Sequence, residues 1–167
     1  MASLIYLRAP EMADRGALLA AVRASRALHR PWISAPSTAA AFAAYLKKMS
    51  EAANHPYLVC RSDTDQIAGV INLTNVVLGV FRSGYLGYYA LCPHQGRGYM
   101  RAGLHAVVNH AFRTLRLHRL EANIQPENRA SLALARSCGF RREGYSPRYL
   151  KIGGRWRDHE RWAILSG

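Results

Sequence analysis

Residues 83–117, SGYLGYYALCPHQGRGYMRAGLHAVVNHAFRTLRL, contain the pattern that decides the fold. The first part, residues 85–91, is aromatic and aliphatic, as a buried strand is, and Pro93 ends it. A glycine-rich turn follows at residues 95–98. Beyond the turn, apolar residues recur at steps of three and four, which is typical of one face of an amphipathic helix: Met100, Leu104, Val107, Ala111 and Leu115. The stretch therefore predicts a strand, a glycine-rich turn and a helix.

The glycine-rich turn predicts a site for a phosphate or pyrophosphate group. The first backbone amides of a helix have no partner within the helix, and the helix dipole adds partial positive charge there. Gly96 and Gly98 lack Cβ atoms, so an anion can approach these amides. A P-loop would need Gly-Lys-Ser or Gly-Lys-Thr, which is absent, and the dinucleotide fingerprint would need glycine where Arg101 stands. An ordinary connection from strand to helix is the alternative interpretation.

Length and composition predict a single globular domain over residues 1–167. The chain is 50% hydrophobic, which suits a packed core. No apolar run approaches the ~20 residues that cross a bilayer, and the N-terminus lacks the pattern of a signal peptide. The three cysteines, Cys60, Cys92 and Cys138, show no CxxC spacing, and the seven histidines show no ligand spacing. We therefore expect reduced thiols, no metal, no membrane association and a cytoplasmic protein.

The charge is strongly positive. Lys and Arg number 23 against 10 Asp and Glu, which gives a net charge of +13. This balance favours an anionic partner, such as a phosphate-bearing cofactor or a ribosome or another particle rich in nucleic acid. A solvated arginine-rich surface without a partner is the alternative. The charge also counts against polyamine substrates, which it would repel.

Hydrophobic patterns, turns and caps predict further elements on both sides of the central stretch. Helices are expected from Pro10 to about Leu28, from a cap at Ser37 or Thr38 to Met49, and from Asn128 to Ser137, closed by Gly139. Strands are expected at residues 4–8, 57–61, 67–74, 119–125, 140–145, 149–152 and 162–165. We predict an α+β fold, a mixed and mostly antiparallel twisted sheet of about six to seven strands flanked by about four helices. Residues 85–125 would form its parallel crossover.

Three stretches resemble a known family. Residues 95–100, QGRGYM, resemble the acyl-CoA pyrophosphate loop Gln/Arg-x-x-Gly-x-Gly/Ala of the GNAT acetyltransferase superfamily, with a departure at Met100. Residues 120–145 place Pro-x-Asn-x-x-Ser after a strand and end a short helix with Gly-Phe, as that fold does. The ending YLKIGGRWRDH at 149–159 and the RPW of residues 30–32 resemble the Rim-type ribosomal-protein N-terminal (alanine) acetyltransferases. The resemblance covers essentially the whole chain.

The resemblance implies that acetyl-CoA is the co-substrate and lies between the fourth and fifth strands, which are parallel and splay apart. The backbone at Leu91 and Cys92 would bind the pantetheine or the acetyl carbonyl. The pyrophosphate would be held by Gln95, Gly96, Arg97, Gly98, Tyr99 and Met100. Asn128 would contact the cofactor arm, although it could instead be only a helix N-cap. Ser131 would give a proton to the leaving thiolate, or be a plain residue of the helix's first turn.

On the substrate side, Trp32 is predicted to form a wall of the site because it follows a helix break, and it could alternatively be core. Asn72 and Tyr88 are further predicted substrate-binding residues. Tyr149 could be a general acid or a core strand residue. No strong general base is evident, and Glu121 is only a weak candidate. The chemistry does not require one for an N-terminal amine. An α-amine has a pKa of about 7.7–8.0, so roughly a tenth of it is neutral at pH 7, against about one part in two thousand for a lysine.

The sequence thus favours transfer of an acetyl group from acetyl-CoA to a primary amine, in particular the N-terminal α-amine of a protein such as a ribosomal protein. Two alternatives remain open at this point. The acceptor could be the amine of a small drug or metabolite, or the chain could be a non-catalytic acyl-CoA-binding or ribosome-binding module. We expect a monomer or a homodimer.

Overall fold

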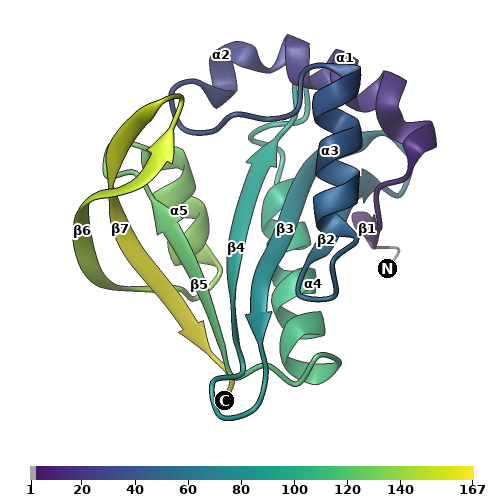
Figure 1. The fold of residues 1–167 in the computed structure, drawn as a ribbon. Helices are drawn as coiled ribbons and strands as arrows, with labels where there is room; N and C mark the ends of the chain where they lie inside the picture. The colour runs from purple at the N-terminus through teal and green to yellow at the C-terminus, as the bar shows by residue number, and fades with distance from the viewer. Residues whose placement is uncertain (1–2) are drawn as a thin grey trace.

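The computed structural model describes residues 3–167 and contains a seven-stranded sheet with helices on both faces (Figure 1). The strand order is β1-β2-β3-β4-β5-β7-β6. The strands are β1 (Ile5–Arg8), β2 (His55–Arg61), β3 (Ile67–Val77), β4 (Ser83–Ala90), β5 (Arg119–Ile124), β6 (Arg141–Ile152) and β7 (Arg155–Leu165). β4 and β5 are parallel, and the other neighbouring pairs are antiparallel. The predicted mixed, mostly antiparallel sheet is confirmed.

The helices of residues 3–167 are a short 3-10 turn at Met12–Asp14, α1 (Arg15–Ala24), α2 (Arg26–His29), α3 (Ala39–Met49), α4 (Tyr99–Arg113) and α5 (Arg129–Ser137). The helix predicted from Pro10 to Leu28 is divided into α1 and α2 at Ser25. The Ser25 hydroxyl donates to the carbonyl of Ala21 at 2.6 Å and accepts from the amide of Cys92 at 2.8 Å. A serine that bonds back to its own helix in this way bends it, so the chain turns here toward the end of β4.

β4 and β5 pair over only half of the length of β4. The pairing runs from Ser83 opposite Arg119 to Leu86 opposite Ala122. Beyond that point β4 continues to Ala90 along β3, while β5 continues along β7. The carboxyl ends of the two strands therefore diverge, as Figure 1 shows, and the splay predicted from the resemblance is present.

Two hydrophobic clusters hold the helices on the two faces of the sheet. One includes Leu104, Val107 and Ala111 of α4, together with residues of α5 and most strands. The other joins α1 and α3 to β2, β3 and Leu91. Successive side chains of β2 point to opposite faces of the sheet: Val59 belongs to the first cluster, and its neighbours Leu58 and Cys60 belong to the second. Each buried leucine contributes about 1.5–3 kcal/mol to the free energy of folding.

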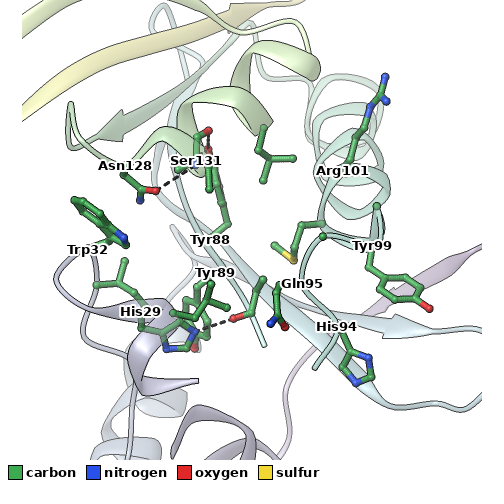
Figure 2. Close-up of a pocket in the computed structure, with 18 residues that line it drawn as sticks. His29, Trp32, Tyr88, Tyr89, His94, Gln95, Tyr99, Arg101, Asn128 and Ser131 are labelled. Carbon is green, nitrogen blue, oxygen red and sulfur yellow. Dashed lines mark hydrogen bonds between the residues drawn. The ribbon is translucent and has the colours of Figure 1, made fainter. Parts of the chain in front are cut away.

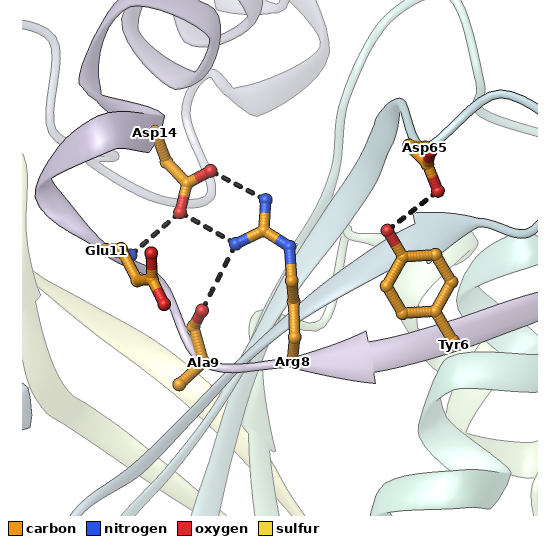
Figure 3. Close-up of polar contacts among 6 residues, drawn as sticks. All are labelled: Tyr6, Arg8, Ala9, Glu11, Asp14 and Asp65. Carbon is orange, nitrogen blue, oxygen red and sulfur yellow. Dashed lines mark hydrogen bonds and ion pairs between the residues drawn. The ribbon is translucent and has the colours of Figure 1, made fainter.

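An ion pair ties β1 to the helices that follow it (Figure 3). The Arg8 guanidinium bonds both carboxylate oxygens of Asp14, at 2.6 and 2.9 Å. The backbone amide of Glu11 donates to the same carboxylate at 2.7 Å, which closes the 3-10 turn. The Arg8 guanidinium is the main cause that lowers the pKa of the Asp14 carboxyl. On the same face of β1, two residues before Arg8, the Tyr6 hydroxyl donates to Asp65 at 3.0 Å.

The C-terminal hairpin differs from the prediction. The strands expected at residues 140–145 and 149–152 form one strand, β6, whose pairing with β7 shifts register between Arg142 and Gly144 and again between Ser146 and Leu150. β7 begins at Arg155 rather than at residue 162. None of the helices in residues 3–167 is both long and apolar enough to cross a membrane.

Candidate active site

A cavity of about 350 Å³ lies at the open end of the sheet, beside the last residues of β4 (Figure 2). Its walls come from α2, the segment after it, β4, the glycine-rich turn and the first turn of α5. The walls are mostly apolar, with a few polar groups at fixed positions. Figure 2 shows His29 and Trp32 on one side of the cavity and Tyr99 and Arg101 on the other. This arrangement is typical of a binding site for a small molecule.

The glycine-rich turn has the backbone geometry that a phosphate site needs. Gly96 and Gly98 have φ values of 73° and 84°, and Gly98 immediately precedes α4. A Cβ added at either glycine would meet no atom within 4 Å, so the space above them is open. Among residues 3–167, no acceptor is bonded to the backbone amides of residues 95–101, and the first amide of the α4 ladder is that of Ala102. Seven successive amides are therefore available to an anion.

Met100, where the family pattern has Gly or Ala, is accommodated by another glycine. A Cβ on Gly69 of β3 would lie 2.1 Å from the Met100 sulfur. The methionine thus packs over bare backbone and lines the cavity. Arg101, in the first turn of α4, also lines it. A cation there opposes the helix dipole, and a bound anion would offset that cost.

Tyr88 and Ser131 form a hydrogen-bonded pair inside the cavity. The Ser131 hydroxyl donates to the Tyr88 hydroxyl at 3.1 Å, and the Tyr88 hydroxyl donates to the Ser131 carbonyl at 3.4 Å. Burial raises the pKa of Tyr88 to about 12, so its hydroxyl stays protonated at neutral pH. Asn128 is the N-cap of α5, with its side-chain oxygen accepting from the Ser131 amide at 3.2 Å. Asn128 is therefore an N-cap that also lines the cavity, and its predicted contact with the cofactor arm stays a prediction.

The opposite wall is built on the segment after α2. The His29 ring nitrogen Nε2 lies 2.7 Å from the carbonyl oxygen of Ala90, and the ring stands edge-on to Tyr89 at 5.0 Å. Gln125 donates to the Trp32 carbonyl at 3.1 Å, which fixes the start of this segment against the end of β5. Trp32 is half-buried and lines the cavity, and its predicted role as a wall of the substrate site stays a prediction.

A second, smaller cavity of about 80 Å³ fills the gap between β4 and β5. It shares Tyr88 and Ser131 with the first cavity. His159 lines it, and the His159 Nδ1 lies 2.9 Å from the carbonyl oxygen of Arg157. A carbonyl only accepts, so Nδ1 carries the proton in the neutral ring and Nε2 bears the lone pair. The buried side-chain oxygen of Asn123, in the same cavity, has no partner among residues 3–167.

Two residues predicted to bind the cofactor are already bonded within the protein. The Leu91 amide donates to Ala68 at 2.9 Å, and the Leu91 carbonyl accepts from His94. The Cys92 amide donates to Ser25. Neither amide is free to hold an acetyl carbonyl, so that part of the prediction for Leu91 and Cys92 is wrong, and the predicted contact of this backbone with the pantetheine stays a prediction. The chain crosses back into the core at this point, and backbone groups there must be paired.

Three further predicted residues lie outside the cavities. Glu121 sits opposite Tyr85 in the paired part of β4 and β5, before they diverge, and Arg119 bonds it at 2.7 Å. Asn72 accepts from Tyr45 at 2.6 Å and lines neither cavity. Tyr149 packs edge-on against His159 at 6.3 Å and lines neither cavity. None of the three lines either cavity, and their predicted roles stay predictions.

The remaining loop residues differ in what they present. Gln95 and Tyr99 line the larger cavity, and the Tyr99 ring also packs against His94 at 6.0 Å. The exposed side chain of Arg97 does not line this cavity, and its predicted contact with the pyrophosphate stays a prediction. No group of three potential metal-ligating side chains occurs within residues 3–167.

Sequence reasoning missed His29, Arg101 and His159. A basic residue in the first turn of a helix was a usable signal for Arg101, because it opposes the dipole. His159 belongs to the WRDH ending that was noted only as a resemblance. Nothing local marks His29, because its role depends on contact with the end of β4, 61 residues away.

Comparison with known proteins agrees with this fold and site. Residues 5–141 match the family model described as the acetyltransferase (GNAT) domain. The match covers most of the chain, so the chain belongs to the GNAT acetyltransferase family. A ribosomal protein uS5-alanine N-acetyltransferase of Escherichia coli is 44% identical over 104 residues, which are 62% of this chain and 54% of that enzyme. The probable N-acetyltransferase YjcK of Bacillus subtilis is 30% identical over 73% of this chain and 67% of that protein.

Solved structures give the same result. Mycobacterium smegmatis RimJ in complex with CoA-disulfide superposes with a TM-score of 0.90 at 29% identity, over 97% of this chain and 82% of that one. Spermidine N-acetyltransferase of Vibrio cholerae, in complex with CoA and spermine, gives 0.83 at 25% identity, over 98% and 96%. The Rim-type resemblance is confirmed, and the chain is an acetyl-CoA-dependent N-acetyltransferase. The matched region spans about half of the E. coli enzyme.

Proposed function

We propose that this enzyme acetylates the N-terminal α-amine of a protein, of the ribosomal-protein type. The observation that carries the proposal is that the two cavities meet at Tyr88 and Ser131. The larger cavity, with its anion-binding turn, suits acetyl-CoA. The smaller one offers neutral acceptors, the Asn123 oxygen and the His159 Nε2, and its walls hold no carboxylate. Neutral acceptors suit one uncharged amine better than a polycation.

The residues that line the two cavities include one group that can accept the proton lost by the amine and one that can supply a proton to the leaving thiolate. The amine nitrogen forms a bond to the acetyl carbon while the carbon–sulfur bond breaks. His159 or a water accepts the proton that the amine loses. The Tyr88–Ser131 pair supplies a proton to the departing thiolate. The cofactor phosphates bind the amides of residues 95–101, and Asn128 and Trp32 hold the two substrates in place.

The choice of an α-amine is consistent with the absence of a carboxylate base. An α-amine needs only a weak base at pH 7, because roughly a tenth of it is already neutral. A lysine would need a much stronger one. We propose the ribosome or a ribosomal protein as the partner, and this partner would place the enzyme in the cytoplasm. We propose separately that the enzyme is a monomer or a homodimer.

A small amine is the second candidate acceptor, and one observation favours it. Glu127 and Asp158 line a third cavity of about 370 Å³ beside Trp32, and carboxylates attract polycations. Spermidine is the natural test compound, because a spermidine acetyltransferase is among the similar structures. Asp158 is already occupied by the Tyr145 hydroxyl and the Arg148 amide, and Arg157 lines the same cavity. These contacts weaken the case for a polyamine.

The deciding experiment measures release of the CoA thiol from acetyl-CoA with several acceptors. They are peptides that begin Ala or Ser, the same peptides with blocked α-amines and an added lysine, and spermidine. We expect release only with free N-termini. Release with the blocked lysine peptides or with spermidine alone would contradict the proposal and select the corresponding acceptor.

A further inference from the structure

A cavity lined by arginines adjoins the candidate active site. It has a volume of about 430 Å³ and lies between α1, α2, the segment at residues 30–37 and the turn that joins β6 to β7. Its lining contains no Asp or Glu. Its four cationic side chains come from three parts of the chain: Arg23, Arg26, Arg30 and Arg157. We call it the arginine cavity.

The guanidinium groups of the arginine cavity lack anionic partners. Among residues 3–167, ion pairs form at other arginines, and none of these four has a carboxylate within 4.0 Å. Arg23 donates only to the Ser37 carbonyl, at 3.3 Å. Within residues 3–167, the Nε of Arg157 is buried and has no hydrogen-bond partner. Arg23, Arg26 and Arg30 are exposed, so water screens much of their repulsion, whereas the buried and unpaired Nε of Arg157 costs free energy that a bound anion would offset.

The arginine cavity lies on the acceptor side of the active site. His29 and Ile33 line both the arginine cavity and the 350 Å³ cavity of the candidate active site, so the two spaces meet at these side chains. In Figure 2, His29 stands on the wall opposite Tyr99 and Arg101, where the glycine-rich turn begins α4. The cofactor phosphates have their own site at that turn. The arginine cavity is therefore placed to bind the other substrate.

We propose that the arginine cavity binds carboxylate side chains of an acceptor polypeptide, within the first few residues after its N-terminus. This inference rests on the proposed acetylation of protein N-termini. The planar fork of arginine fits a carboxylate with two hydrogen bonds. Val22, Pro31, Ile33 and Ile152 also line the cavity, and such apolar surface suits the aliphatic stems of Glu side chains. A nucleic-acid backbone would bring successive phosphates but nothing to cover these apolar groups.

The test compares a peptide that begins Ala and carries Glu at positions two to five with its isosteric Gln counterpart. We expect wild-type kcat/KM to be at least about tenfold higher for the Glu peptide, through KM. The variant R26Q/R30Q should lose this preference and keep its KM for acetyl-CoA. Neither side chain makes a hydrogen bond or ion pair within residues 3–167, so the fold should tolerate the change. R15Q/R113Q removes the same charge from two exposed sites outside the cavity and should retain the preference.

Binding separates this inference from the proposed function. An acetylated Glu peptide, which cannot react, is titrated with wild type and R26Q/R30Q by fluorescence anisotropy. Binding that needs the two arginines supports the arginine cavity even if no peptide is turned over. Equal binding or equal kcat/KM in wild type and R26Q/R30Q would overturn it. Tighter binding of an RNA oligonucleotide of equal charge, lost in R26Q/R30Q, would also overturn it and assign the cavity to phosphates.

Discussion

At the scale of single residues, the hydroxyl pair of Tyr88 and Ser131 is the group best placed to protonate a leaving thiolate. We expect Tyr88→Phe and Ser131→Ala each to lower kcat by about 10- to 100-fold with little change in acetyl-CoA binding. The double variant should be no worse than the poorer single one, because the two hydroxyls act as a unit. Stopped-flow and steady-state kinetics with an Ala peptide measure this.

Tyr89→Phe is the matched control for Tyr88→Phe. Tyr89 lines the same cavity, and its buried hydroxyl has no partner within residues 3–167. Its removal should leave kcat unchanged. Because burial raises the pKa of Tyr88 to about 12, wild-type kcat should also hold steady up to pH 10. Equal effects of the two Phe variants, or an alkaline loss of kcat near pH 9, would remove Tyr88 from the mechanism.

His159 is the residue we propose as the proton acceptor, and pH distinguishes that role from a structural one. His159→Gln should lower kcat/KM for an Ala peptide by about 100-fold at pH 7. The loss of kcat/KM in His159→Gln should become smaller toward pH 9, because the α-amine is then mostly neutral and needs no base to remove its proton before attack. Exposed His105→Gln on α4 is the control and should match wild type. A deficit that is the same at every pH would mean that His159 only supports the wall.

At the scale of elements, the glycine-rich turn and α4 form the cofactor site as one unit. Gly98→Ala should raise the Kd for acetyl-CoA at least about tenfold, because its Cβ would enter the open space before the free amides. Positive φ adds strain of about 1–2 kcal/mol. Gly79→Ala carries the same strain in a turn outside the cavity, with nothing within 4 Å of its Cβ. Calorimetry should show similar destabilisation in both variants and weak binding only in Gly98→Ala.

Elements with a strong local pattern could be predicted from the sequence. The strand at residues 119–124 alternates cleanly, α4 repeats at helical steps, and Gly139 ends α5 with a φ of 90°. The break at Ser25 could not be predicted, because it depends on a bond to Cys92, 67 residues away. The union of two predicted strands into β6 escaped for a similar reason. Only pairing with β7 carries the strand through its two irregularities.

The part of the candidate site that depends on backbone conformation, the glycine-rich turn, could be predicted from the sequence. The part that depends on where β4 and β5 diverge could not. The open glycines and the positions of Trp32 and Ser131 followed from motif and resemblance. Glu121 lies outside the two cavities because β4 and β5 separate only after Leu86 and Ala122, a length that no local pattern encodes. Two residues further along β5, the same face reaches the small cavity with Asn123.

At the scale of the whole molecule, the charge imbalance makes the carboxylates disproportionately important to stability. Ten acidic residues face 23 lysines and arginines, and ion pairs hold several of them. The pKa values of Asp14, Asp63, Glu143 and Asp158 are all lowered, chiefly by hydrogen bonds to Arg8, Arg61, Arg119 and Tyr145 respectively. A lowered pKa in the folded state contributes stability that is present above the unfolded value and is lost as pH falls through the folded one.

Acid unfolding should therefore depend most on Asp14, which pairs with Arg8 (Figure 3). Asp14 is the least exposed of these four acidic residues. We expect Asp14→Asn to lower the free energy of unfolding by about 1–3 kcal/mol at pH 7. The difference from wild type should narrow as pH falls below the ordinary value of 3.8, because the unfolded chain then protonates Asp14 while the folded state still holds it charged. The difference should vanish once pH has fallen through the lowered pKa of the folded state. Asp63→Asn, at an exposed pair, is the control and should change little. Urea unfolding of the three proteins between pH 3 and 7 measures this, and a loss in Asp14→Asn that stays constant across that range would show that packing, not charge, is what Asp14 provides.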